Sequence, residues 1–188
     1  SSDVCSSDLM EWPGYSSEYI DGSVDVLTEH LIPAILRDGV GDPLLAHERL
    51  AHFKGHPMSK AALETAILDA WLRSRQLSLG DYLGAVRAEV DCGVSVGIPT
   101  TERIDDLLEE VSDYVAQGYR RIKLKIQPGW DLEPVRAVRQ AWPEMPLQTD
   151  ANQAYTRADG ALLAAMDPFD LLLVEQPLPE DDLLGHVE

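Results

Sequence analysis

The second half of the chain alternates short apolar segments with amphipathic helical segments, and this alternation constrains the fold more than any other feature. Within it, residues 104–115 place apolar side chains at helical spacing, and Asp131 and Thr156 are positioned to cap the two helices that follow. Strands that alternate with helices across short loops form βαβ units with right-handed crossovers, so we predict a parallel sheet. Its four strands are expected at 92–98, 121–126, 147–151 and 171–175.

Four parallel strands admit either an open doubly wound sheet or part of a closed barrel. Gly93 and Gly97 do not build a glycine-rich phosphate loop after the first strand, which leaves a dinucleotide-binding or P-loop protein with little support. A complete barrel takes about 250 residues and eight strands. The predicted fold class is α/β, with residues 89–188 as the first half of a TIM-like βα-barrel. Residues 10–88 are predicted to be a partial, mainly helical part of an α+β capping domain.

Helical patterns dominate the chain before residue 89. Ser23 is positioned to cap a helix over 24–36, although Pro33 strains its later part. A second helical stretch is expected over 43–53. Ser59 is expected to cap a third helix, whose apolar residues recur on one face.

The first nine residues have neither periodicity nor a turn pattern. Residues 1–9 match the translation of a common sequencing-adapter oligonucleotide. We therefore expect an assembly artefact, with the natural sequence resuming near Met10 and Cys5 not a biological cysteine. The same residues encoded by different codons in an independently sequenced genomic copy would contradict this hypothesis.

Composition argues against several classes of partner. The chain has 33 acidic and 15 basic residues and a net charge of −18, which disfavours binding to nucleic acid or to anionic lipid. No apolar segment approaches the roughly 20 residues of a membrane span, and no signal-peptide pattern is present. We expect a cytoplasmic protein, without nucleic-acid or membrane partners, in which Cys92 is a free thiol.

Charged residues end three of the expected strands. Lys123 and Lys125 share one face of the second strand, which is unexpected in a buried parallel strand. Asp150 ends the third strand and Glu175 the fourth, and the steps from Lys125 to Asp150 and from Asp150 to Glu175 are both 25 residues. Taken singly, each acid is more commonly a cap or a loop-facing group. At one level of a barrel, however, a bound cation relieves their repulsion, and oxygen ligands favour Mg²⁺, with Mn²⁺ or another divalent ion as alternatives.

Three motifs in this region resemble those of a known family. Lys-Leu-Lys at 123–125, Asp-Ala-Asn at 150–152 and Glu-Gln-Pro at 175–177 resemble the signature of the enolase superfamily, muconate-lactonizing subgroup. More closely, the chain resembles the o-succinylbenzoate synthases that also act as N-acylamino acid racemases. That similarity runs from about residue 15 to residue 188, and its further motifs lie at 15–19, 53–56, 92–97 and 123–130.

The resemblance implies a role for each matched residue. Lys125 would be the catalytic acid/base and Lys123 its helper near the substrate carboxylate, while Asp150 and Glu175 would be the first two metal ligands. The resemblance also implies substrate contacts, the two tyrosines lying in a specificity loop of the capping domain: Ser95, Asn152, Tyr15 and Tyr19.

The implied reaction is Mg²⁺-dependent removal of a proton α to the carboxylate of a small-molecule substrate. A divalent ion and cationic side chains stabilise the resulting enediolate, and a neighbouring cation lowers the pKa of a lysine toward useful base strength. Dehydration in menaquinone biosynthesis would follow, making the enzyme a carbon-oxygen lyase. The alternatives are an N-acylamino acid racemase or related epimerase, which shares the first half-reaction, and a non-catalytic α/β scaffold with solvated charges.

Two catalytic groups of the family have no counterpart in this sequence. The third metal carboxylate, on the fifth strand, and the opposing lysine, on the sixth, are expected beyond Glu188. We therefore expect the 188-residue polypeptide to bind Mg²⁺ poorly and to have no turnover. A homo-oligomer is an open alternative for the full-length enzyme.

Overall fold

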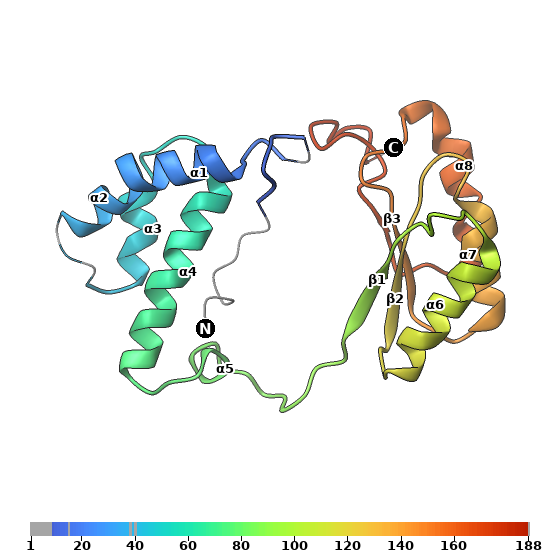
Figure 1. Ribbon diagram of the computed structural model, residues 1–188, viewed down its shortest axis with the longest axis horizontal. Coiled ribbons are helices and arrows are strands. Elements are labelled where there is room, and N and C mark those ends of the chain that lie inside the picture. The colour runs from blue at the N-terminus through green and yellow to red at the C-terminus, as the bar shows by residue number, and fades with distance from the viewer. Residues whose placement is uncertain (1–8, 15, 38, 40, 188) are drawn as a thin grey trace. The chain divides into compact units, whose positions relative to one another are not determined.

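The computed structural model describes residues 9–187 apart from positions 15, 38 and 40. It divides into two compact units, Ser1–Ala88 and Glu89–Glu188 (Figure 1). Each unit encloses an apolar cluster of its own. The residues of the expected artefact lie outside the described part except for Leu9, and Cys5 and Tyr15 lie outside it as well.

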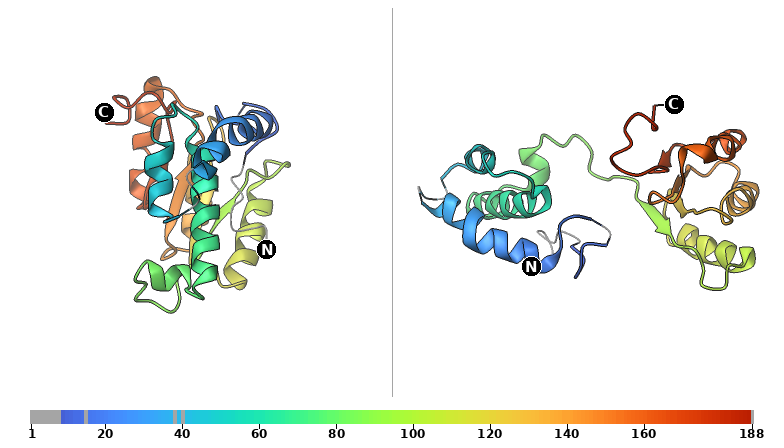
Figure 2. Two further views of the ribbon diagram at one scale, coloured as in Figure 1. Left: turned by 90° about the vertical axis from the view of Figure 1, so that its left-hand side faces the viewer. Right: turned by 90° about the horizontal axis from the view of Figure 1, so that it is seen from above.

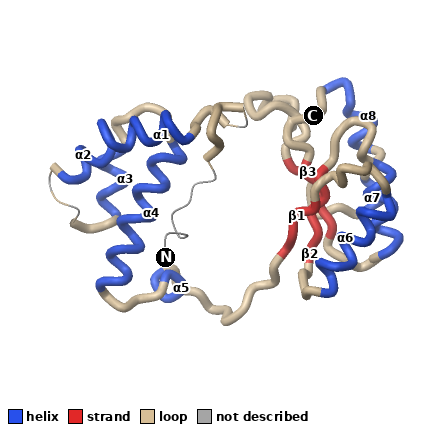
Figure 3. Tube along the Cα trace, in the orientation of Figure 1, coloured by secondary structure: helices blue, strands red, loops and turns tan. Residues whose placement is uncertain are grey.

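Helices make up the regular structure of the described part of the N-terminal unit, shown in blue in Figure 3. The long helix expected to start at residue 24 begins at Ile20 instead, so Ser23 is buried inside it and does not cap it. Residues 79–84 contain a short helix. The elements are α1 Ile20–Val26, the π-helical segment Leu27–Leu31, α2 Ile32–Leu36, α3 Leu44–Leu50, α4 Pro57–Ser74 and α5 Leu79–Tyr82.

Pro33 explains the π-helical segment. Proline has no N–H to continue the i→i−4 ladder, and its ring crowds the carbonyl four residues earlier. The widened turn of Leu27–Leu31 comes directly before α2, where Pro33 lies in the first turn and its missing N–H costs little. The strain expected at Pro33 is thus relieved without ending the helical path.

Glu18, and not Ser59, caps helix α4. The helix begins at Pro57, so the predicted Ser59 cap is wrong. Glu18 is only 7% exposed. Its carboxylate accepts hydrogen bonds from the backbone N–H of Met58 at 2.7 Å and of Ser59 at 2.9 Å, and from the Ser59 hydroxyl at 2.7 Å. Burial by itself raises the pKa of Glu18, but these hydrogen bonds outweigh it and hold the pKa below its ordinary value.

The C-terminal unit is a four-stranded parallel sheet in the order β1-β2-β3-β4, which confirms the predicted βαβ arrangement. The fourth strand is shorter than expected, although Leu172 N donates to Leu147 O and Thr149 N donates to Leu173 O ahead of it. The elements are β1 Gly93–Val96, α6 Ile104–Ala116, β2 Arg121–Lys125, α7 Leu132–Ala141, β3 Leu147–Asp150, α8 Gly160–Ala164 and β4 Val174–Glu175.

The helices of this unit cover one face of the sheet (Figures 1 and 2). Ile122 and Leu124 of β2 are fully buried in the cluster beneath them. The predicted caps are confirmed: the Asp131 carboxylate accepts from Leu132 N at 2.6 Å, and Thr156 forms a capping box with Asp159. Because successive side chains of a strand point to opposite faces, packing Ile122 and Leu124 under the helices turns the lysines of β2 to the other face.

Candidate active site

The register of the sheet places the charged strand ends side by side. Lys125 is the Cα partner of Asp150, and Asp150 is the partner of Glu175, as the equal spacing of 25 residues predicts. One layer earlier, Lys123 is the partner of Gln148 on one side and of Ser95 on the other. The site therefore lies at the carboxyl ends of the strands, which is where parallel βα sheets bind their ligands.

Asp150 and the two lysines form one ion-pair network. Lys125 Nζ lies 2.6 Å from Asp150 Oδ2, and Lys123 Nζ lies 3.0 Å from the same oxygen. Lys123 Nζ also lies 3.2 Å and 3.1 Å from the two carboxylate oxygens of Glu175. Lys125 donates a further hydrogen bond to Asn152 Oδ1. The arrangement pairs two cations with two anions and therefore cancels the repulsion expected between like charges.

Asp150 is the most buried charge of the network, with 2% of its side chain exposed. Burial alone raises the pKa of Asp150, but hydrogen bonds from Lys125, from Lys123 and from the Asn152 backbone N–H outweigh it. The net shift holds the pKa of Asp150 below its ordinary value, so the carboxylate stays ionised.

Lys123 is held in its charged form. Desolvation acts to lower its pKa, yet the hydrogen bonds and charges of Asp150 and Glu175 are stronger and raise the pKa above the ordinary value. The charged neighbours of Lys123 are both carboxylates, which favour its cationic form.

The backbone turns sharply just after both acids. Asn152 and Gln153 follow β3 with φ of 43° and 67°, and Gln176 follows β4 with φ of 42°. A left-handed conformation is uncommon outside glycine, and such residues cluster at functional sites. The two turns are joined by a hydrogen bond of 2.7 Å from Gln153 N to Gln176 O. Sequence reasoning missed this pair of turns, because glutamine carries no local signal for a positive φ.

The structure does not test the other predicted substrate contacts. Ser95 lies on β1 as the partner of Lys123, but within the described residues its hydroxyl has no hydrogen-bond partner. Tyr19 belongs to the N-terminal unit, directly before α1. Tyr15 lies outside the described residues. The proposed substrate contacts of these three residues remain predictions.

The donors fit a hard divalent cation by their chemistry. Asp150 and Glu175 offer four carboxylate oxygens at one level of the sheet, and Mg²⁺ is commonly held by one or two carboxylates together with substrate and water. No group of three or more His, Cys, Asp or Glu side chains that could hold a metal ion occurs among the described residues. Cys92 is a free, exposed thiol.

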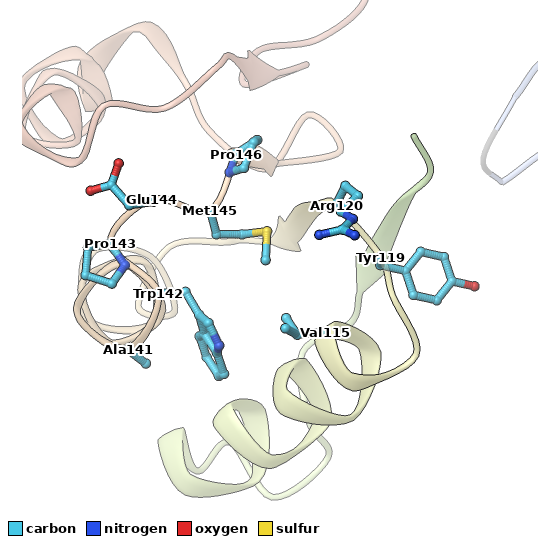
Figure 4. Close-up of a pocket in the computed structure, with 9 residues that line it drawn as sticks. All are labelled: Val115, Tyr119, Arg120, Ala141, Trp142, Pro143, Glu144, Met145 and Pro146. Atoms are coloured by element: carbon cyan, nitrogen blue, oxygen red, sulfur yellow. The ribbon is translucent and has the colours of Figure 1, made fainter. Parts of the chain in front are cut away.

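A separate cavity lies at the opposite end of the sheet. It has a volume of about 420 Å³ and is bordered by the end of α6, the end of α7 and the segments that lead into β2 and β3 (Figure 4). Trp142 and Met145 line it together with Arg120 and Glu144. Because the lysines and carboxylates lie at the carboxyl ends of the strands, this cavity plays no part in their chemistry.

A parallel βα sheet with lysines and carboxylates at successive strand ends defines an α/β protein with the site layout of a βα-barrel enzyme. Residues 106–188 match the family model described as Enolase C-terminal domain-like. An N-succinylamino acid racemase from an Amycolatopsis species is 54% identical over 180 residues, which is 95% of this chain and 48% of that protein. An o-succinylbenzoate synthase from Geobacillus kaustophilus is 45% identical over 93% of this chain and 46% of its own length.

Solved structures agree with these matches. An enolase-superfamily member from Enterococcus faecalis V583 has a TM-score of 0.88 at 41% identity, covering 95% of this chain and 48% of that one. A muconate lactonizing enzyme from Pseudomonas putida, at 23% identity, shares the fold with a TM-score of 0.79 over 93% of this chain and 50% of its own. Residues 106–188 thus match the C-terminal domain of the enolase superfamily, and the α/β fold class predicted from the sequence is confirmed. It spans about half the length of the curated relatives it matches.

None of the helices in the described part of the chain has the length and apolar character that a membrane crossing requires.

Proposed function

We propose that this chain supplies part of the active site of a divalent-metal-dependent enzyme that removes the proton α to a carboxylate. The observation that carries the proposal is the network at the strand ends, in which two lysines are hydrogen-bonded to two adjacent carboxylates. The proposed substrate is a small-molecule carboxylate, the proposed location is the cytoplasm, and neither nucleic acid nor a membrane is a proposed partner. A non-catalytic scaffold does not need charged groups at this depth, because burying ionic groups costs free energy.

Lys125 is the proposed acid/base. Its Nζ is fixed between Asp150 Oδ2 and Asn152 Oδ1, so the atom that would accept or donate the proton has a defined position. Lys123, one layer deeper, would present its charge to the substrate carboxylate. Asp150 and Glu175 would hold the metal. When bound, a divalent ion supplies positive charge that stabilises an enediolate.

Two activities share this first proton transfer. Dehydration to o-succinylbenzoate, with a place in menaquinone biosynthesis, is the leading proposal because relatives at 41–45% identity carry the name o-succinylbenzoate synthase. N-acylamino acid racemisation is the second, favoured by the relative at 54% identity that is named N-succinylamino acid racemase. Adjacent menaquinone genes in the source genome would favour the synthase.

The test uses a hybrid protein in which this chain replaces the matching half of the Amycolatopsis relative, which is 54% identical to it. The hybrid is assayed with Mg²⁺ for dehydration to o-succinylbenzoate and for α-proton exchange of N-succinylamino acids in D₂O. Activity that disappears in Lys125→Ala and in Asp150→Asn supports the proposal. Full activity in both variants would overturn the assigned roles and favour a non-catalytic scaffold.

A further inference from the structure

Gln148 is a buried polar residue of the candidate site with no role so far. It lies on β3 two residues before Asp150, so both side chains point to the same face of the sheet. The residue is 5% exposed, and its Nε2 donates to Glu175 Oε2 at 3.5 Å, a long hydrogen bond. Its Oε1 is enclosed and has no hydrogen-bond partner among the described residues.

The orientation of this amide follows from charge. Turning the amide over would place Oε1 against the Glu175 carboxylate, which is repulsive, so the NH₂ group must face Glu175. The consequence is that the amide oxygen is left without a donor. A buried acceptor without a partner destabilises the fold, and such a group in a native fold requires an explanation.

Thr149 offers a direct comparison. Its hydroxyl is also buried without a hydrogen-bond partner among the described residues, but alternation along β3 places it on the opposite face, away from Asp150. Gln148 and Thr149 therefore both carry a buried oxygen without a hydrogen-bond partner among the described residues. Of the two side chains, that of Gln148 donates to a candidate metal ligand.

We propose that Gln148 is a positioning residue for Glu175. Its NH₂ group orients the carboxylate from the layer below, and its Oε1 is the acceptor for a donor that arrives when the site is filled, namely a water carried by the divalent cation. Hydrated Mg²⁺ commonly keeps several waters, each a strong donor. Outer hydrogen bonds of this kind orient metal-binding carboxylates. This inference rests on the proposed function, because it needs Glu175 to bind the cation.

The test is a Mn²⁺ titration of the hybrid, followed by the EPR signal of free Mn²⁺, together with a thermal unfolding measurement. Gln148→Met keeps the length of the side chain and removes both polar groups. We expect its Kd for Mn²⁺ to rise about 10-fold or more, as when a residue that hydrogen-bonds to a metal ligand is replaced. Its Tm should be unchanged or higher, since an unpaired oxygen has been removed. Thr149→Val should show the same trend in Tm with an unchanged Kd.

The outcomes separate the inference from the proposed function. If the hybrid binds Mn²⁺ and Gln148→Met has an unchanged Kd, the inference is overturned and the proposed function is not. Equal losses of affinity and Tm in Gln148→Met and Thr149→Val would also overturn it, because they indicate a general packing effect. A hybrid with no Mn²⁺ binding at all would overturn the proposed function and the inference together. If Gln148→Met does not fold, Gln148→Leu carries the same expectation.

Discussion

Lys125 and Asp150 face each other across neighbouring strands, with Lys125 Nζ 2.6 Å from Asp150 Oδ2. The same carboxylate is also paired with Lys123, and its second oxygen accepts from the Asn152 backbone N–H at 3.1 Å. Asp150 thus holds the candidate base, its helper and the turn that follows β3. Removing its charge should affect binding, catalysis and stability together.

Asp150→Asn should weaken cation binding and folding of the hybrid. The amide is a poorer ligand for a hard cation and leaves two lysines less well paired, so we expect the Mn²⁺ Kd to rise by at least tenfold. Because both lysines keep partial contact with water, the loss of stability should be about 2 kcal/mol, below the range for fully buried pairs. Mn²⁺ titration and urea unfolding measure the two effects. Asp113→Asn on the exposed side of α6 is the control and should change neither.

Replacing Lys125 should abolish proton transfer more completely than it affects binding. In the hybrid, Lys125→Met removes the atom proposed to move the proton, and general-base catalysis contributes about 10²–10⁴ in rate. We expect α-proton exchange in D₂O, followed by ¹H NMR, to fall by that factor. Lys54→Met, at an exposed position of the N-terminal unit, should leave the rate unchanged. Exchange at the normal rate in Lys125→Met would refute the assignment of the base.

Much of the barrel half was accessible from the sequence because its signals are local. The charged face of β2 follows from the alternation of polar and apolar side chains around Lys123 and Lys125. The shared level of Asp150 and Glu175 follows from the equal βα steps. The caps at Asp131 and Thr156 depend on neighbouring residues and were predicted correctly. In each case the determining contacts lie within one element or between adjacent ones.

The features that the sequence did not reveal depend on distant contacts. Glu18 caps α4 from 40 residues away, so the nearer Ser59 was wrongly taken as the cap. Arg139 binds backbone carbonyls, which no side-chain pattern records. The orphan oxygen of Gln148 depends on packing from all sides. Side-chain chemistry alone cannot predict these contacts.

The pKa of Glu18 makes the N-terminal unit sensitive to acid. Its folded pKa lies below the ordinary value of 4.5, so the carboxylate contributes stability that is present above pH 4.5 and is lost as pH falls through the folded pKa. Glu18→Gln should therefore destabilise by about 1–2 kcal/mol at neutral pH, the range for a lost helix cap. The difference from the parent chain should shrink below pH 4.5.

Urea unfolding of the 188-residue chain at pH 7 and at successively lower pH measures this dependence. Glu29→Gln, at an exposed position of the π-helical segment, is the matched control and should show no such dependence. A constant difference between Glu18→Gln and the parent at all pH values would contradict the assigned carboxylate cap.

Arg139 should be the charged residue of α7 whose replacement most weakens the C-terminal unit. Its guanidinium donates to Pro143 O and Met145 O at 3.0 and 2.7 Å, before β3, and to Phe169 O and Asp170 O at 2.8 and 3.0 Å, before β4. A lysine has three donors on one atom and cannot reproduce this planar fork. We expect Arg139→Lys to lower the free energy of unfolding by about 2–3 kcal/mol, since hydrogen bonds to charged groups contribute 1.5–3 kcal/mol.

Arg136→Lys provides the comparison for Arg139→Lys, because Arg136 is an exposed arginine on the same helix whose guanidinium lies 5.9 Å from the Phe169 ring centre. Its substitution should cost less than about 0.5 kcal/mol, as is usual for surface positions. Urea unfolding of both variants in the 188-residue chain gives the two values. Equal stabilities would show that the carbonyl contacts of Arg139 do not hold the two segments. A selective loss in Arg139→Lys would show that the Arg139 guanidinium holds together the segments that lead into β3 and β4.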